Sequence, residues 1–132
     1  MTPAAYAAQR ARFVDDSVST ASPERLLTML YDRLLLDLAR AGNAQLAGDR
    51  AEANKHLTHA QDIVLELASS LRVDAWEGAA DLAAIYAFLH SELVRAHVTG
   101  DPARIAATRG LVEPLAEAWR AAAAQVAKRT EW

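Results

Sequence analysis

The sequence predicts an all-α fold, an antiparallel four-helix bundle preceded by a short N-terminal helix. Of the 132 residues, 52% are hydrophobic and 23% charged, with only 5 glycines. This composition, rich in Ala and Leu, favours a helical domain over an all-β, disordered or fibrous chain. Leucines also recur at the three- and four-residue spacing of a helix face. The length suits a single helical domain over residues 1–132 with one continuous core.

The N-terminal stretch is expected to be only weakly ordered, with a mobile segment over about residues 1–16. Residues 4–14 are Ala-rich with scattered charges and predict a short, weakly held helix. A strong start signal follows, because Ser22 can accept backbone N–H bonds as the N-cap and Pro23 suits the first helical position. Glu24 then complements the positive end of the helix dipole.

Glycine and aspartate separate the next helices. The first long helix is expected over residues 23–47, where a glycine stops it and Asp49 caps the helix that follows. That second helix is expected over residues 50–71. A third should cover residues 75–98, with Asp74 as its cap.

The last helix has a clear start signal of its own. Gly100 is expected to end the preceding helix, Asp101 to cap the new one and Pro102 to open it. The helix should reach about residue 128, with Pro114 kinking it or loosening one turn. Four long helices with short connections predict an up-down bundle.

Helical phase assigns one apolar stripe of each long helix to the core. The residues expected to face inward are Leu26, Leu27, Leu30, Tyr31, Leu34, Leu35, Leu38, Ala41, Leu57, Ala60, Val64, Leu67, Ala68, Leu71, Leu82, Ile85, Tyr86, Leu89, Leu93, Ala96, Ile105, Val112, Leu115, Trp119, Ala123 and Val126. Four apolar residues fall instead on the charged sides of their helices: Met29, Leu36, Leu65 and Phe88. Single exposed apolar residues are common, but their recurrence on several helices suggests anchors for a partner helix or extended peptide.

Charge and cysteine content exclude several functions. The 14 Lys and Arg residues are outnumbered by 17 Asp and Glu, and no basic block provides a nucleic-acid footprint. With no cysteine, the chain has no disulfide, thiolate ligand or cysteine nucleophile. It also lacks a signal-peptide core and a membrane-length apolar run. We therefore expect a cytosolic protein without membrane insertion.

Histidine spacing raises one metal hypothesis. His56 and His59 are three residues apart and Glu52 lies one turn earlier, so the three side chains could form a partial metal site. The plainer interpretation is two solvated histidines on a polar face, because no second helix supplies a Glu-x-x-His partner. His90 and His97 lie near the edge of an apolar face, where helix-edge packing is the default explanation.

Catalysis is not expected. Asp15, Asp16 and Asp74 could serve as general acids or bases, but capping and solvation explain them and no nucleophile accompanies them. The sequence has no Gly-rich phosphate loop, nucleophile elbow or zinc motif. We expect a protein that is not an enzyme and needs neither cofactor nor metal.

The stretch SVSTASPERLLTMLYDRLLLDLARA, with FVDD before it, resembles the N-terminal signature of the FliS family, cytosolic export chaperones of flagellin. The similarity continues in order through A-x-x-x-GD, HAQDIVLELASSL, LAAIYAFLHSEL and LVEPLAEAW, and it covers nearly the whole chain. The resemblance implies an elongated four-helix bundle with a short N-terminal helix. It also implies a partner, the disordered C-terminal segment of flagellin, bound as an extended wrap with helical pieces.

A stoichiometric chaperone would mask this apolar segment before export, preventing premature polymerisation, and flagellar export-gate proteins are possible further partners. Burial of apolar surface must then offset the entropy lost when the segment becomes ordered. Met29, Leu36, Leu65 and Phe88 are the candidate anchors. We also expect Tyr6 or Phe13 to dock over part of the groove in the free chaperone.

Two alternatives remain open at the level of sequence. A structural helical adaptor of another system could use the same outward apolar residues for a different amphipathic partner. A metal-binding or oxidoreductase bundle is the weaker alternative, since it requires converging ligands that the sequence does not supply.

Overall fold

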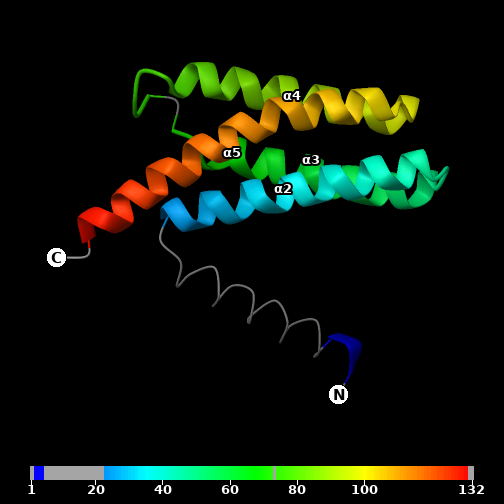
Figure 1. The fold of residues 1–132 in the computed structure, drawn as a ribbon, viewed down its shortest axis with the longest axis horizontal. Helices are drawn as coiled ribbons and strands as arrows, with labels where there is room; N and C mark the ends of the chain where they lie inside the picture. Colours follow the sequence, from blue (N-terminus) through cyan, green and yellow to red (C-terminus); the bar gives the residue numbers. More distant parts are fainter. Residues whose placement is uncertain (1, 5–22, 73, 131–132) are drawn as a thin grey trace.

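The structure is a computed structural model and describes residues 2–4, 23–72 and 74–130, without the side chains of residues 127, 129 and 130. In this part of the chain four helices follow one another: α2 (Pro23–Leu46), α3 (Arg50–Ser70), α4 (Ala79–Thr99) and α5 (Pro102–Thr130). Helix α2 packs against α3 and α5, and α4 packs against the same two helices (Figure 1). The predicted four-helix bundle is confirmed. The expected N-terminal helix and its mobile segment fall largely outside the described residues.

The turn between α2 and α3 follows the predicted chemistry. Gly48 has a φ of 77°, a left-handed conformation that suits glycine and ends the helix. Asp49 is the N-cap of α3, and its carboxylate accepts the backbone N–H of Glu52 at 3.1 Å. The predicted cap Ser22 lies outside the described residues.

The turn between α4 and α5 is equally tight. Gly100 has a φ of 67° and its N–H donates to the Ala96 carbonyl, which ends α4 in a left-handed cap. Asp101 directly precedes α5, and its Oδ1 accepts the N–H of Ala103 at 3.0 Å. Both tight turns lie at the same end of the bundle, which we call the closed end (Figure 1).

Side chains from the α2–α3 turn reinforce the closed end. The Gln45 amide donates to the carbonyl of Gly100, and Arg50 donates to the carbonyl of Val98. These donors satisfy carbonyls that the last turn of α4 leaves without intrahelical partners. These hydrogen bonds tie the α2–α3 hairpin to the C-terminal end of α4.

The start of α4 differs from the expectation. The helix begins at Ala79 rather than Ala75, and the residue in the N-cap position is Gly78, which makes no side-chain cap. Asp74 is therefore not the cap. Residues 74–78 form a turn in which the N–H of Ala79 donates to the carbonyl of Trp76. This turn takes up the residues that sequence alone assigned to the first turn of the helix.

The core is a continuous apolar cluster that contains most of the predicted inward residues. Two predictions were wrong, since Ile85 and Val126 are exposed. Ile63 and Ala116 are buried although the predicted stripes omitted them. Helix α5 continues through Pro114 as one element, and Pro114 itself is exposed.

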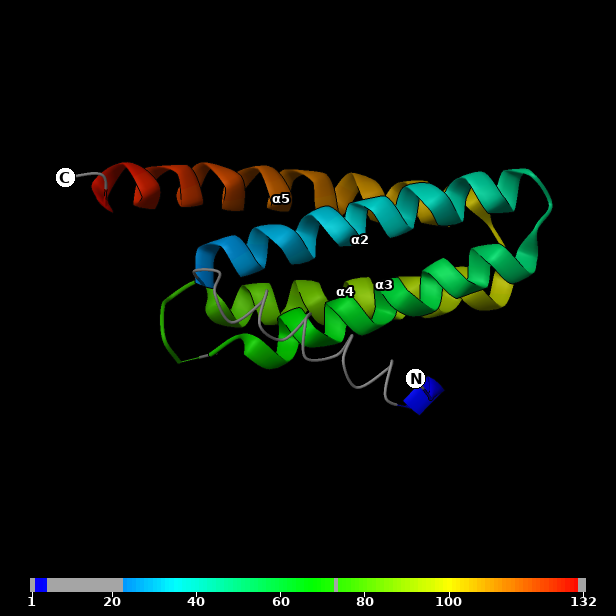
Figure 2. The ribbon, with the colours of Figure 1, turned by 90° about the horizontal axis from the view of Figure 1, so that it is seen from below.

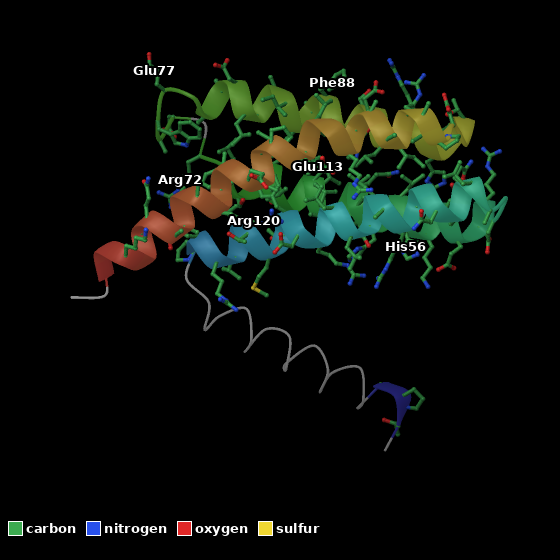
Figure 3. The ribbon with its side chains drawn as sticks, viewed as in Figure 1. His56, Arg72, Glu77, Phe88, Glu113 and Arg120 are labelled. Carbon is green, nitrogen blue, oxygen red and sulfur yellow. The ribbon has the colours of Figure 1, made fainter. Side chains whose placement is uncertain are left out.

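Helices α4 and α5 lie close together at the closed end and diverge toward the opposite end in Figure 1, and in the view of Figure 2 α2 lies between them over most of its length. Near the closed end, Arg104 of α5 forms an ion pair with Glu92 of α4 at 3.1 Å. Further along, Arg120 of α5 pairs instead with Asp32 of α2, where Figure 3 shows α5 passing that helix. Helix α5 thus stays with α2 and leaves α4, so the bundle opens at the end where α2 and α4 begin.

Candidate functional site

An apolar groove lies at the open end of the bundle. It has a volume of about 770 Å³, against about 320 Å³ for the hollow between α2 and α5 at the other end. The residues that line the groove are Pro23, Leu26, Leu27, Met29, Leu30, Glu66, Leu67, Ser70, Leu71, Arg72, Ala75, Trp76, Leu82, Tyr86 and Trp119. All four helices and the α3–α4 connection contribute to it. A mostly apolar hollow with a few polar groups is the usual character of a binding site.

The first two turns of α2 form one wall of the groove. Leu26, Leu27 and Leu30 belong to the predicted core stripe, and they pack against the core cluster or beside it. They are only partly buried because α4 and α5 have separated at this level. The same helical periodicity therefore produces core deeper in the bundle and binding surface at its open end.

Trp76 forms the wall on the side of the α3–α4 connection. Its side chain is 49% exposed although it lines the groove. The indole ring lies directly over Gly78, where an added Cβ would overlap the ring. Gly78 has φ and ψ of −84° and −2°, which any residue can adopt, so glycine here leaves space for the ring and does not serve an unusual backbone conformation. The sequence did not single out Trp76, because the expected helix over residues 75–98 included it, whereas the structure places it in the turn before α4.

Charged residues stand at the rim. Glu66 near the end of α3 and Arg72 just beyond that helix line the groove with opposite charges, and Figure 3 labels Arg72 beside the α3–α4 connection. Both side chains are exposed. An apolar centre with a charged rim is the arrangement found in protein interfaces.

A pair of tyrosines lies in the floor. The hydroxyls of Tyr31 on α2 and Tyr86 on α4 are 2.6 Å apart and hydrogen bonded, and the two residues are only 1% and 2% exposed. Trp119 on α5 is partly buried and packs against the same core cluster. Burial raises the pKa of both phenols above the ordinary value, because the phenolate would lose its hydration. The hydrogen bond between the two neutral phenols joins α2 to α4 beneath the groove.

The four predicted anchors are exposed, as their helical phase indicated, but the structure does not bring them together at the groove. Met29 lines the groove, whereas Leu36, Leu65 and Phe88 do not. Figure 3 shows Phe88 on the side of α4 that faces away from α2 and α3. Tyr6 and Phe13 lie outside the described residues.

The interpretation of two solvated histidines was wrong for His56, which is mostly buried, whereas His59 is exposed as expected. Both lie at the α2–α3 seam around Asp37, whose side chain is 0% exposed. His59 Nδ1 is hydrogen bonded to Asp37 Oδ2, and the His56 side chain is only 13% exposed, with its Nε2 3.0 Å from Glu52 Oε1. Arg33 Nε lies 3.4 Å from Asp37 Oδ1. Asp37 escaped attention because its phase lies at the edge of the apolar stripe.

No three His, Asp or Glu side chains among the described residues are placed to hold a metal ion together. The two histidine rings instead use nitrogen atoms in pairs with carboxylates. Asp15 and Asp16 lie outside the described residues. None of the helices that the structure describes has the length and apolar character needed to cross a membrane.

Comparison with known proteins gives the groove a family context. Residues 5–126 match the family model "FliS: Flagellar protein FliS". A Bacillus subtilis protein named flagellar secretion chaperone FliS is 32% identical over 110 residues, which cover 83% of this chain and 82% of the relative. Proteins of the same name from Escherichia coli and Salmonella typhimurium are 28% and 29% identical, each over 81% of this chain and 80% and 81% of the relative. The chain, with its four-helix bundle and open apolar groove, belongs to the FliS family of flagellar secretion chaperones.

Proposed function

We propose that the groove at the open end binds the disordered C-terminal segment of flagellin and masks it before export. The observation that carries the proposal is the apolar groove of about 770 Å³, lined by all four helices, in a chain of the FliS family. An extended or partly helical segment can insert its apolar side chains between α2, α4 and Trp119. Masking these side chains prevents the segment from pairing with other flagellin subunits.

The mechanism requires only stoichiometric burial. A disordered segment loses conformational entropy when it becomes ordered, and each Å² of apolar surface that it buries returns about 25 cal/mol. Trp76 and Met29 supply adaptable contacts for this purpose, because they are already at the surface and change little of the core when they move. The protein acts as a binding partner and carries out no chemical step.

A long segment would extend beyond the groove. Leu36, Leu65 and Phe88 are exposed on three helices and offer anchors for such a wrap. Tyr6 and Phe13 are proposed to cover part of the groove in the free protein and to move aside for the segment. Complex formation takes place in the cytosol, and the loaded chaperone then meets the flagellar export gate.

The test is calorimetric titration of the full chain with the C-terminal segment of flagellin from the same organism. Met29→Glu with Trp76→Glu should weaken binding, because two carboxylates then enter an apolar groove. Both positions are exposed, so helical circular dichroism should be retained. The matched control is Val98→Glu, an exposed apolar residue near the closed end.

Equal affinity of the wild type and the groove variant would remove the groove from the interface. Single variants Leu36→Glu, Leu65→Glu and Phe88→Glu then distinguish a compact site from a wrap, since only a wrap is sensitive to them. Deletion of residues 1–16 should strengthen binding if that segment only competes for the groove. It should weaken binding if Phe13 contacts flagellin directly.

A further inference from the structure

The two hydroxyls of the tyrosine pair supply two hydrogen-bond donors, but the contact between them uses only one. Each hydroxyl carries one hydrogen, and only one of the two hydrogens can occupy the 2.6 Å contact between Tyr31 and Tyr86. The second hydroxyl hydrogen is therefore left to bond elsewhere.

Position relative to the groove decides which hydroxyl keeps the spare hydrogen. If Tyr86 donates to Tyr31, the Tyr31 hydrogen is left in the interior, where the partner of its hydroxyl in the described structure is Tyr86 itself. If Tyr31 donates to Tyr86, the spare hydrogen belongs to Tyr86, which lines the groove. Buried donors are almost always satisfied in native proteins, so Tyr31 donates to Tyr86 and the Tyr86 hydrogen is left for a partner in the groove.

We infer that Tyr86 is a specificity-determining residue, whose hydroxyl donates a hydrogen bond to an oxygen of the bound segment. The inference rests on the proposed function, because it assigns a polar contact within the same groove. In the free protein, water that enters the groove can accept this hydrogen. A bound segment displaces that water and must present a carbonyl, hydroxyl or carboxylate oxygen at the same point.

The donor gives an otherwise apolar groove a means of fixing register. Apolar contacts alone tolerate sliding of an extended segment, whereas one directional hydrogen bond favours the alignment that places an acceptor opposite Tyr86. Tyr86 is held firmly for this role by its neighbour Tyr31 and by its position in the core cluster. Segments with only apolar side chains and no free carbonyl at this point should bind less tightly.

The experiment compares Tyr86→Phe with wild-type protein by calorimetry, using the flagellin C-terminal segment as ligand. We expect a loss of about 3- to 10-fold in affinity, as for one net hydrogen bond. Tyr31→Phe is the matched control, because it breaks the same tyrosine pair but keeps the hydroxyl of Tyr86, the member of the pair that lines the groove. Its loss of affinity should be smaller.

Segment variants identify the acceptor. Polar side chains of the segment are replaced one at a time by Ala, and backbone amides one at a time by esters, which are weaker acceptors. At one position the change should weaken binding to wild type but not to Tyr86→Phe, since the shared hydrogen bond is already lost. Equal losses for Tyr86→Phe and Tyr31→Phe, or the absence of any coupled position, would overturn the inference while leaving the groove as the binding site. No binding of the segment to wild-type protein would overturn both proposals.

A measurement on wild-type protein covers the case in which Tyr86→Phe does not fold. With ¹³C at the tyrosine Cζ atoms and a mixture of H₂O and D₂O, slow hydroxyl exchange resolves separate signals for the protonated and deuterated forms. The Tyr86 hydroxyl should exchange more slowly in the complex than in the free protein. Unchanged exchange after the segment binds would contradict the proposed hydrogen bond.

Discussion

At the scale of single residues, Tyr31 and Tyr86 link the fold to pH. Burial raises the pKa of both phenols above the value of about 10 that tyrosine has in an unfolded chain. The folded state therefore holds these protons more tightly than the unfolded state. The resulting stability is fully present below about pH 10 and is lost as the pH rises above it.

We accordingly expect the free energy of unfolding to fall above about pH 10, by about 1.4 kcal/mol per pH unit for each of the two tyrosines. Tyr86→Phe removes one of the two titrations and should reduce the slope. Urea unfolding at several pH values measures it. A slope that is the same in wild type and variant would show that Tyr86 ionises as easily in the folded protein as in the unfolded chain.

Two glycines allow a matched test of the groove wall. Gly78→Ala places a methyl group against the Trp76 ring, whereas Gly110 of α5 has no atom within 4 Å of an added Cβ. Because Trp76 is half-exposed, its ring can swing outward, and Gly78→Ala should weaken flagellin binding by about tenfold with little loss of stability. Gly110→Ala should leave binding unchanged and stabilise the helix by up to about 1 kcal/mol. Thermal unfolding and calorimetry check both, and a Gly78→Ala variant with wild-type affinity would show that the wall does not contact flagellin.

At the scale of the helices, the seam between α2 and α3 carries a buried carboxylate with exposed partners. Asp37 is fully buried, whereas the side chains of Arg33 and His59 are each 47% exposed. The carboxylate has lost its hydration and depends on these partners, but the partners can be solvated without it. Removal of the exposed partners should therefore lower the free energy of unfolding more than removal of the buried carboxylate.

Asp37→Asn should destabilise the protein by less than about 2 kcal/mol, since Arg33 and His59 then become hydrated. Arg33→Ala with His59→Ala leaves the buried carboxylate with His56, whose Nδ1 lies 3.9 Å from Asp37 Oδ1, and should cost about 3 to 5 kcal/mol. Chemical denaturation of the two variants at neutral pH makes the comparison. The reverse order would mean that water reaches Asp37 once its partners are removed.

The sequence predicted the helices and their ends well, but it predicted the contacts between helices less well. Gly48, Asp49 and Gly100 act at the positions predicted, because caps and stops depend on a few neighbouring residues. The start of α4 was missed, because the turn before it depends on the packing of Trp76 over Gly78. Asp37 was missed for a similar reason, since its partners come from another helix.

At the scale of the whole molecule, the groove could not be derived from helical phase. Leu26 and Leu30 belong to the same apolar stripe as fully buried leucines further along α2, and the divergence of α4 from α5 makes them part of a groove. Met29, which outward phase selected as a candidate anchor, lines the groove, but phase could not distinguish it from Leu36 one heptad later, which does not. The angle between α4 and α5 depends on the packing of all four helices, which the phase of a single helix does not specify.

Because all four helices line the groove, flagellin should stabilise the entire bundle. A ligand that binds only the folded state, present at 100 times its dissociation constant, adds about 2.7 kcal/mol to the free energy of unfolding. The variant Met29→Glu with Trp76→Glu should show less of this stabilisation at the same ligand concentration. Thermal unfolding with and without the flagellin segment measures it, and the absence of any shift at saturation would indicate binding to the unfolded chain as well.

The placement of both tight turns at the closed end also determines the order in which the molecule assembles. Each hairpin, α2–α3 and α4–α5, closes a loop of only a few residues, which costs little entropy and allows contacts to form from the turns outward. The open end joins last and should fray first, so amides there should exchange with solvent sooner than those near Gly48 and Gly100. Under the proposed function, the chaperone would bind its disordered client with the region expected to be least stable, and the bound client would in turn stabilise the end of the bundle that holds it.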